Sequence, residues 1–238
     1  MKGLLFKPWK AQAIHESNPG KEWQTRRIIR FPYHNKLGIW EPTHITPEGL
    51  KDRFGQPANF APYWGMWHTR TGKIITCPYS IGEQVYIKET HYRYGHWEDT
   101  GKLTKHGRAE YRFIPESDNV LYLENPPDSY LTSPHGYFNG TAWYKRSSLF
   151  LPADLARTVV TIKDIRAQRV QDISEKDARA EGVEAMYQTT EAGYVWDSHG
   201  YQRAFMLLWD SIHGEGAWER NDWVWKYSFI RREHETTN

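Results

Sequence analysis

The chain has 238 residues, with 31 Lys and Arg against 29 Asp and Glu, and a formal net charge of +2. This length allows one large domain or two small ones, and the core needs no covalent cross-links. The near-balanced charge excludes a polycation that coats nucleic acid by charge alone. Any nucleic-acid surface therefore has to be a local patch.

Aromatic residues are the unusual part of the composition: the chain has 12 Trp and 15 Tyr, and its mean hydropathy is −0.80. This combination favours a small β-rich core with aromatic, polar-tipped surfaces over a Leu-rich helical bundle. A single cysteine, Cys77, excludes an internal disulfide and any multi-cysteine zinc site. The apolar part of the N-terminus is too short for a signal peptide, and no run is long enough to span a bilayer. We expect a cytoplasmic protein that does not bind a membrane.

The first predicted elements are a strand at residues 4–6 and a helix from Trp9 to Ser17, which Asn18-Pro19-Gly20 ends. The next stretch, residues 20–27, is here called the octet. It reads Gly-Lys-Glu-Trp-Gln-Thr-Arg-Arg and is followed by a strand at Ile28-Ile29.

The octet combines side chains that suit a nucleotide-like ligand. Arg26 and Arg27 carry planar forks that match phosphate or carboxylate groups. Trp23 could stack on a base, and Thr25 could donate to a carbonyl or attack it. Gly20 lets the backbone turn or approach a ligand closely. The octet therefore predicts the mouth of a small site, and the alternative is a solvated basic turn with Trp23 half buried.

The region after the octet changes from loop to hairpin. Prolines and glycines predict a loop from about Tyr33 to Pro57, and we expect an insertion near residues 35–60. Strands are predicted at residues 63–68 and 73–76, joined as a hairpin at Thr71-Gly72.

Residues 82–90 alternate in polarity and predict a strand that ends with Lys88 and Glu89. The following residues, 91–142, are polar, turn-rich and weakly periodic. We expect a large loop-rich insertion here rather than a separate core, and a surface on which a protein partner could bind.

The C-terminal part has the clearest periodicity. Residues 158–165 predict a strand, residues 201–213 an amphipathic helix, and residues 223–229 a closing strand with an aromatic face. A short helix is expected from a Ser174 cap to about Glu181, with Gly182 suited to its C-terminal end.

Strands dominate this order and do not alternate regularly with helices, so the fold class expected is α+β. A small closed or partly open β-barrel with flanking helices suits the pattern best. The spacings of the 11 histidines do not predict a metal site, because no His-Glu-x-x-His motif occurs. The chain also has neither a Gly-x-Ser-x-Gly elbow nor a Walker-type phosphate loop. No metal and no cofactor are expected.

Lys21, Thr25 and Glu181 would form a sensible catalytic set if the fold brought them together. A lysine with a lowered pKa can act as a base, a threonine as the nucleophile, and a glutamate can carry the proton to a leaving amine. The alternative for each charged residue is a solvated surface group, and spacing alone does not decide between the two.

Five blocks of sequence occur in an order that resembles phage-encoded ASCH-domain proteins of the PUA-like superfamily. They are the octet and residues 82–90, 172–182, 208–212 and 223–225. The resemblance implies one domain over residues 1–238, with insertions near 35–60 and 91–142 and a small pseudo-barrel with a cleft. It also implies a role with RNA, a modified nucleobase or a nucleoside, in the host cytoplasm if a phage encodes the chain.

One bacterial branch of that family hydrolyses the amide of N4-acetylcytidine. It uses a lysine and a threonine of a Gly-x-Lys-x-x-Thr-x-Arg motif and a glutamate on the short helix. The motif's glycine, threonine and arginine fall on Gly20, Thr25 and Arg27, and the helical acid falls on Glu181. The lysine position holds Glu22, with Lys21 beside it.

Because Glu22 stands at the lysine position, binding of RNA or a modified nucleoside is the function favoured by the sequence. The alternatives are a metal-independent amidohydrolase on N4-acetylcytidine-like substrates, a nuclease, and a non-catalytic phage accessory or interaction protein. The candidate catalytic residues are Lys21, Thr25 and Glu181, and the candidate ligand-binding residues are Gly20, Trp23, Arg26, Arg27, Lys88 and Glu89.

Overall fold

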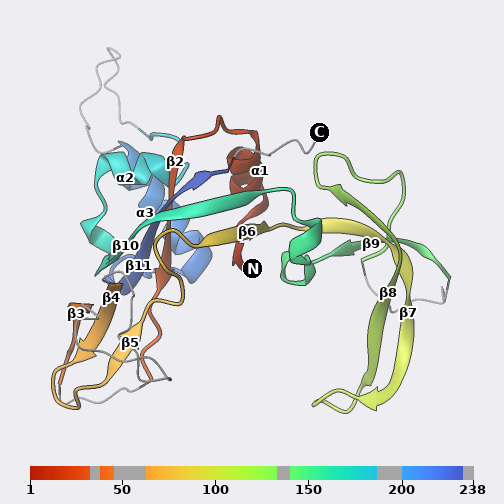
Figure 1. The fold of residues 1–238 in the computed structure, drawn as a ribbon, viewed down its shortest axis with the longest axis horizontal. Coiled ribbons are helices and arrows are strands. Elements are labelled where there is room, and N and C mark those ends of the chain that lie inside the picture. Colours follow the sequence, from red (N-terminus) through yellow and green to blue (C-terminus); the bar gives the residue numbers. More distant parts are fainter. Residues whose placement is uncertain (33–37, 46–62, 133–139, 187–199, 233–238) are drawn as a thin grey trace, which may run out of the picture. The chain divides into compact units, whose positions relative to one another are not determined.

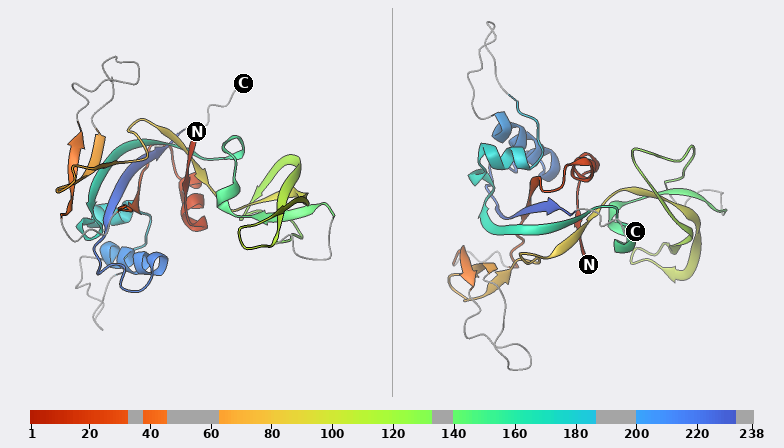
Figure 2. Two further views of the ribbon diagram at one scale, coloured as in Figure 1. Left: turned by 90° about the horizontal axis from the view of Figure 1, so that it is seen from below. Right: turned by 45° about the horizontal axis from the view of Figure 1, so that its top comes forward.

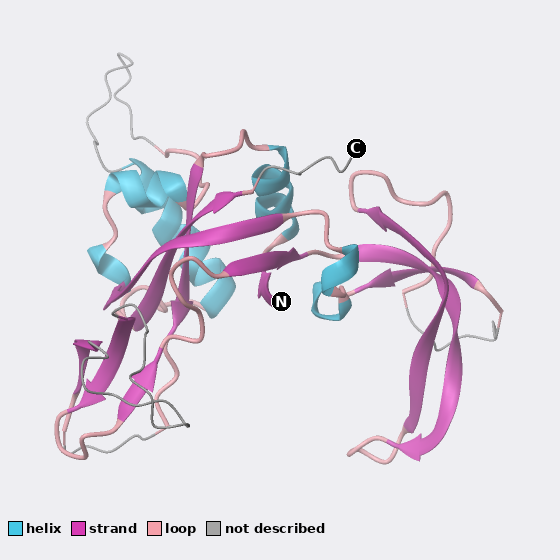
Figure 3. Ribbon diagram, in the orientation of Figure 1, coloured by secondary structure: helices cyan, strands magenta, loops and turns pink. Residues whose placement is uncertain are grey.

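The computed structural model describes residues 1–32, 38–45, 63–132, 140–186 and 200–232. The fold is mixed α+β, with mostly sheets and few helices, as the sequence predicts (Figure 3). None of the described sheets closes into a barrel. No helix in the described ranges is both long and apolar enough to cross a membrane.

The chain forms two compact units. Unit 1 contains residues 1–16 and 85–159, and unit 2 contains residues 17–84 and 160–238. The single domain implied by the family resemblance stays a prediction. Most of the insertion predicted near residues 35–60 lies outside the described residues, apart from residues 38–45.

Unit 1 begins with a short parallel strand pair and a helix. They are β1 (Lys2–Leu5), α1 (Pro8–Glu16) and β6 (Gln84–Lys88), and β1 pairs with β6 from Lys2–Val85 to Leu5–Lys88. Ile14 and Ile87 are fully buried. The predicted N-terminal strand and helix are therefore confirmed within one or two residues.

A three-stranded antiparallel sheet forms the rest of unit 1. Its strands are β7 (His91–Leu103), β8 (Ala109–Tyr122) and β9 (Ala142–Arg146), in the order β8-β7-β9. β7 and β8 lie side by side as a long curved hairpin (Figures 1 and 2). Two 3-10 turns follow β9, η1 (Ser148–Phe150) and η2 (Ala153–Leu155).

The loop-rich structure predicted for residues 91–142 is wrong, because two long strands fill most of that range. Towards the tip of the hairpin most side chains of both strands are exposed or only partly buried. A strand that is exposed on both faces needs no alternation of apolar and polar residues, so its period-2 signal is lost.

Gly95 lies opposite Pro115 of β8, next to a register shift between Arg93 and Gly95. A Cβ atom at this position would overlap the carbonyl oxygen of Ile114 and crowd the Phe113 ring. We expect Gly95→Ala to lower the free energy of unfolding by about 1–3 kcal/mol, because the β8 backbone has to move. Urea unfolding measures this loss, and hydrogen exchange should locate it in the hairpin. An unchanged urea midpoint would contradict the steric argument.

Unit 2 is built on an antiparallel sheet with helices against one face. Within unit 2 the strands of this sheet follow the order β10-β11-β2, from β10 (Val159–Arg169), β11 (Trp223–Arg231) and β2 (Glu22–Ile28). The helices α2 (Glu175–Ala180) and α3 (Gly200–His213) follow the 3-10 turn η3 (Val170–Asp172). Ile173, Phe205, Trp209 and Val224 belong to one hydrophobic core cluster, which joins the helices to the sheet.

The helix boundaries of unit 2 agree with the sequence signals. Ser174 accepts a hydrogen bond from the backbone N–H of Asp177 at 3.1 Å and thereby caps α2, as predicted. Gly182 follows the helix with a φ of +88°, which an L side chain rarely adopts.

A second antiparallel sheet contains β3 (Trp40–Ile45), β4 (Tyr63–His68) and β5 (Ile74–Thr76), and its β4–β5 pair is the predicted hairpin.

Candidate functional site

The octet is mostly strand rather than turn, because β2 begins at Glu22. β2 pairs with β11 without a register shift, so neighbouring side chains point to opposite faces of the sheet. Arg26 lies opposite Lys226, and Thr25 lies opposite Tyr227. The octet therefore has two chemically different faces, which are described in turn.

On the helix-covered face, Arg26 holds two carboxylates of the α2 region. Its Nη1 atom lies 2.9 Å from Oε1 of Glu181, and its Nη2 atom lies 3.4 Å from Oδ2 of Asp177. The Arg26 side chain is fully buried and that of Glu181 is 5 % exposed. The structure thus brings together two of the predicted site residues, which lie 155 positions apart in the sequence.

Asp177 is the centre of this network. It accepts hydrogen bonds from Nε2 of Gln24 at 2.8 Å and from Nζ of Lys226 at 3.2 Å. Burial would raise the pKa of the Asp177 carboxyl, but the Gln24 hydrogen bond and the charges of Lys226 and Arg26 outweigh it and lower that pKa. Asp177 therefore stays ionised and screens the two cations that face each other across β2 and β11.

We call these five side chains the α2 network: Gln24, Arg26, Asp177, Glu181 and Lys226. Sequence reasoning missed Gln24, Asp177 and Lys226 as site residues. Two spacings in the sequence carry the missing signal. Gln24 and Arg26 are two apart on a strand, and Asp177 and Glu181 are four apart at a helix, so each pair shares a face.

The opposite face of the sheet holds Thr25 and a cluster of aromatic side chains. Tyr227, its cross-strand partner, is 1 % exposed and packs edge-on against Tyr79 at 5.4 Å between ring centroids. Cys77 donates its thiol to the Tyr227 hydroxyl at 3.4 Å. Burial and the neighbouring Cys77 raise the pKa of Tyr227 above its usual value, so the phenol stays protonated.

The pleat of β2 turns Thr25 and Arg26 to opposite faces of the sheet. Glu181 is held by Arg26, whose side chain points to the face away from Thr25. In the described part of the chain, no hydrogen bond links Thr25 to Glu181. The catalytic set of Lys21, Thr25 and Glu181 therefore stays a prediction.

Lys21 and Trp23 cover each other at the start of β2. Nζ of Lys21 lies 4.2 Å from the centroid of the Trp23 ring, and Trp23 donates its indole N–H to Oγ of Ser17 at 3.1 Å. Trp23 is only 3 % exposed, so its ring offers no free face to a base and the predicted stacking role does not fit. Gly20 precedes them with a φ of +84°, which explains glycine at this turn.

Arg27 is half buried beside the α2 network and the tyrosine cluster. Burial lowers the pKa of its guanidinium, while the charge of Glu181 and the neighbouring Tyr227 and Tyr79 act in the opposite direction. The group remains a cation at neutral pH, because the pKa of arginine starts above 12.

Lys88 and Glu89, the remaining predicted binding residues, belong to unit 1. Nζ of Lys88 donates to the carbonyl of Leu149 at 3.0 Å. Glu89 pairs with Arg157 at 2.7 Å, and Arg157 also pairs with Glu124. The contacts of Lys88 and Glu89 described here are with unit 1 residues and not with the α2 network.

The α2 network offers ammonium, guanidinium and amide donors next to carboxylate acceptors. Asp177 and Lys226 are its accessible members, with side chains 18 % and 10 % exposed. Within the described residues, no group of three His, Cys, Asp or Glu side chains could hold a metal ion. Comparison of the chain with models of protein families, with curated proteins and with solved structures returned no match.

Proposed function

We propose that unit 2 binds RNA or a modified nucleobase at the α2 network, as an ASCH-type protein of the PUA-like superfamily would. The observation that carries this proposal is the Arg26–Glu181 pair at 2.9 Å, which joins the octet to the short helix. These are two of the blocks on which the family resemblance rests. The β10–β11–β2 sheet and its two helices would then be part of a PUA-like pseudo-barrel.

The burial of the α2 network supports a binding role. Two charges that are buried together lose their hydration, and their mutual attraction often only offsets that loss. Well-packed apolar residues in the same place would therefore give about the same stability. Stability alone therefore does not explain a buried ionic network at this position. Asp177 and Lys226 also place an acceptor and a donor side by side, which is the arrangement that reads the edge of a nucleobase.

Binding is favoured over amide hydrolysis for a geometric reason. A threonine nucleophile and its acid have to reach the same bond, within hydrogen-bond distance of the reacting atoms. Thr25 points to the face of β2 opposite that of Arg26, the residue that binds Glu181, and Glu22 stands at the position of the motif lysine. Both observations favour binding of a base over hydrolysis of its amide.

Titration of the full chain with RNA and nucleosides tests the proposal. We expect a single-stranded RNA, cytidine or N4-acetylcytidine to bind at low salt, measured by calorimetry or fluorescence anisotropy. Asp177→Asn should weaken binding about tenfold, which is the value of one charge-assisted hydrogen bond. Asp164→Asn is the matched control, because Asp164 forms a partly exposed pair with Arg166 at 2.9 Å on β10.

The outcomes separate binding from its alternatives. Absence of binding at low salt, or equal losses in the Asp177 and Asp164 variants, would contradict the proposal. Acetate release from N4-acetylcytidine that disappears in Thr25→Val would replace it by the amidohydrolase. Circular dichroism of each variant shows whether the fold is intact.

A further inference from the structure

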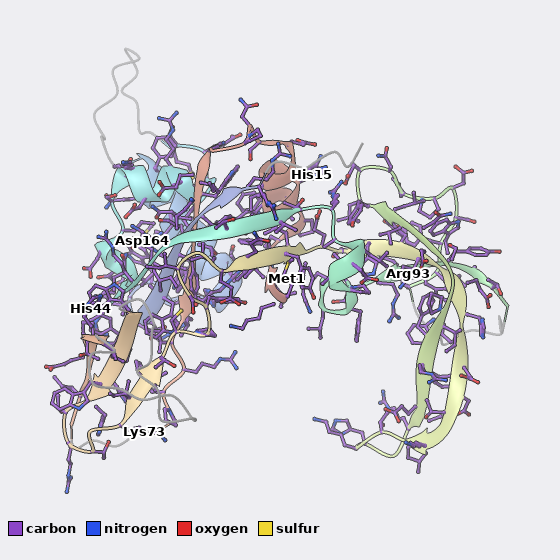
Figure 4. All side chains as sticks on the ribbon, in the orientation of Figure 1. Met1, His15, His44, Lys73, Arg93 and Asp164 are labelled. Atoms are coloured by element: carbon purple, nitrogen blue, oxygen red, sulfur yellow. The ribbon has the colours of Figure 1, made fainter. Side chains whose placement is uncertain are left out.

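A groove of about 780 Å³ lies in unit 1, on the β7–β8 hairpin and the segment that follows β9. We call it the hairpin groove. Its volume falls within the range of small-ligand sites in proteins. Arg93, labelled in Figure 4, lies in the part of β7 that pairs with β9. The lining residues that matter for the argument are Arg93, Trp97, Tyr111, Phe113, Arg146 and Phe150.

The guanidinium of Arg146 is surrounded by aromatic rings. Its Cζ atom lies 4.5 Å from the ring centroids of both Trp97 and Phe113, and 4.9 Å from that of Phe150. Trp97 and Phe113 also pack against Tyr144, which is 2 % exposed. The rings therefore surround the guanidinium and hold it at the groove.

Arg146 has no anionic partner among the residues described. No hydrogen bond or ion pair from its guanidinium is found there, although burial and the charge of Arg93 lower the pKa of the group. Arg93, by contrast, donates to the carbonyl of Ser117 at 3.0 Å. The N–H groups of an arginine that has no carboxylate partner can donate hydrogen bonds to a ligand.

The acidic side chains that line the groove already have partners. Glu98 pairs with Arg112 at 2.8 Å, and Asp99 accepts the backbone N–H of Gly101 at 2.8 Å. Glu110 lies 3.5 Å from the hydroxyl of Thr100. Of these acids only Glu98 is paired with a cation, but the lining holds four cations, Arg93, Lys102, Arg112 and Arg146, against three carboxylates, so its formal net charge is +1.

Exposed rings lie beside Arg146. Phe150 is 58 % exposed and Tyr111 is 37 % exposed, and both line the groove. A solvent-exposed aromatic ring next to a cation suits a ligand that has both an aromatic ring and an anionic group. Aromatic faces of this kind stack on nucleobases without regard to sequence.

We propose that the hairpin groove binds a nucleoside phosphate, either free or within a single-stranded nucleic acid. The guanidinium of Arg146 would hold the phosphate and Phe150 would stack on the base. This site uses only residues of unit 1, and it stands independently of the function proposed for unit 2. An acidic peptide would also supply an anionic group, but it would have no planar ring to stack on the exposed aromatic side chains.

Binding measurements on the full chain at low salt test this assignment. The probes are uridine 5′-monophosphate, a single-stranded RNA of about ten nucleotides, the matching DNA, and a glutamate-rich peptide. Phe150→Ala and Arg146→Lys should each weaken nucleotide binding about tenfold, because lysine keeps the charge but loses the planar fork. Leu149→Ala and Lys105→Ala are the controls, since both residues are exposed, lie nearby and do not line the groove.

The outcomes distinguish both the source of the ligand and the unit that binds it. Binding of the mononucleotide supports a free nucleotide, and binding of the oligomers alone supports a strand. Retention of this binding in Asp177→Asn separates the groove from the α2 network. The assignment is overturned if no nucleotide probe binds, if only the peptide binds, or if both groove variants bind as tightly as the wild type. Phe150 is on the surface, so its variant remains informative even if Arg146→Lys is unstable.

Discussion

Replacement of Arg26 by methionine is expected to lower the free energy of unfolding by about 3–5 kcal/mol. The methionine fills similar space but leaves the carboxylates of Glu181 and Asp177 without their buried cation. A buried charge that loses its partner keeps the full cost of desolvation, which is larger than the net value of the intact pair. Chemical unfolding in urea measures the loss.

A second variant separates the lost partner from the lost packing. Addition of Glu181→Gln to Arg26→Met should recover part of the stability, because the glutamine carries no charge to desolvate. Arg166→Met is the control, since Arg166 is 59 % exposed and pairs with Asp164 on the surface. Its cost should stay below about 1 kcal/mol. Equal losses in the Arg26 and Arg166 variants would show that the α2 network is not a buried ionic unit.

The stability of the protein is expected to fall by about 3 kcal/mol between pH 6.5 and pH 4 because of His91 alone. His91 is fully buried, its Nδ1–H donates to the carbonyl of Glu89 at 3.0 Å, and the charges of Arg146 and Arg93 are nearby. Burial, together with those charges, lowers the pKa of His91 to about 4.

The direction follows from proton uptake by the unfolded chain. Histidine in the unfolded chain has a pKa of about 6.5, so between pH 6.5 and 4 the unfolded state binds a proton that the folded state does not. This destabilisation is absent well above pH 6.5, grows as the pH falls through 4, and levels off below about pH 3, where His91 is protonated in both states.

The comparison of wild type with His91→Asn isolates this contribution, because other groups titrate equally in both proteins. The asparagine amide can replace Nδ1–H as the donor to Glu89 but does not titrate. Urea unfolding across this pH range should show a shallower dependence for the variant. His106→Asn, on the exposed turn of the hairpin, should behave as the wild type. A wild-type slope in His91→Asn would mean that His91 is protonated in the folded state.

The sequence by itself determined the elements that have one buried face. The strand at residues 158–165, the helix at 201–213 and the strand at 223–229 all occur, because burial against a core imposes a period of 2 or 3.6 on the residues. Local signals were equally clear at Ser174 and Gly182, since a cap and a left-handed residue depend on near neighbours alone. The β7–β8 hairpin was not predicted, because neither face of its outer part is covered and its residues therefore lack a period of 2.

Only the tertiary structure decided which residues of the octet act together. Side-chain chemistry and the family resemblance suggested Thr25 with Glu181, yet the pleat of β2 turns Thr25 towards Tyr227 and Arg26 towards Glu181. A shift of one residue along a strand moves every side chain to the opposite face. The register of β2 therefore decides which octet side chains face Glu181, and that register is set by pairing with β11, some two hundred positions away. The Arg146 cluster arises in the same way, from rings on β7, β8 and η1 that no short motif in the sequence connects.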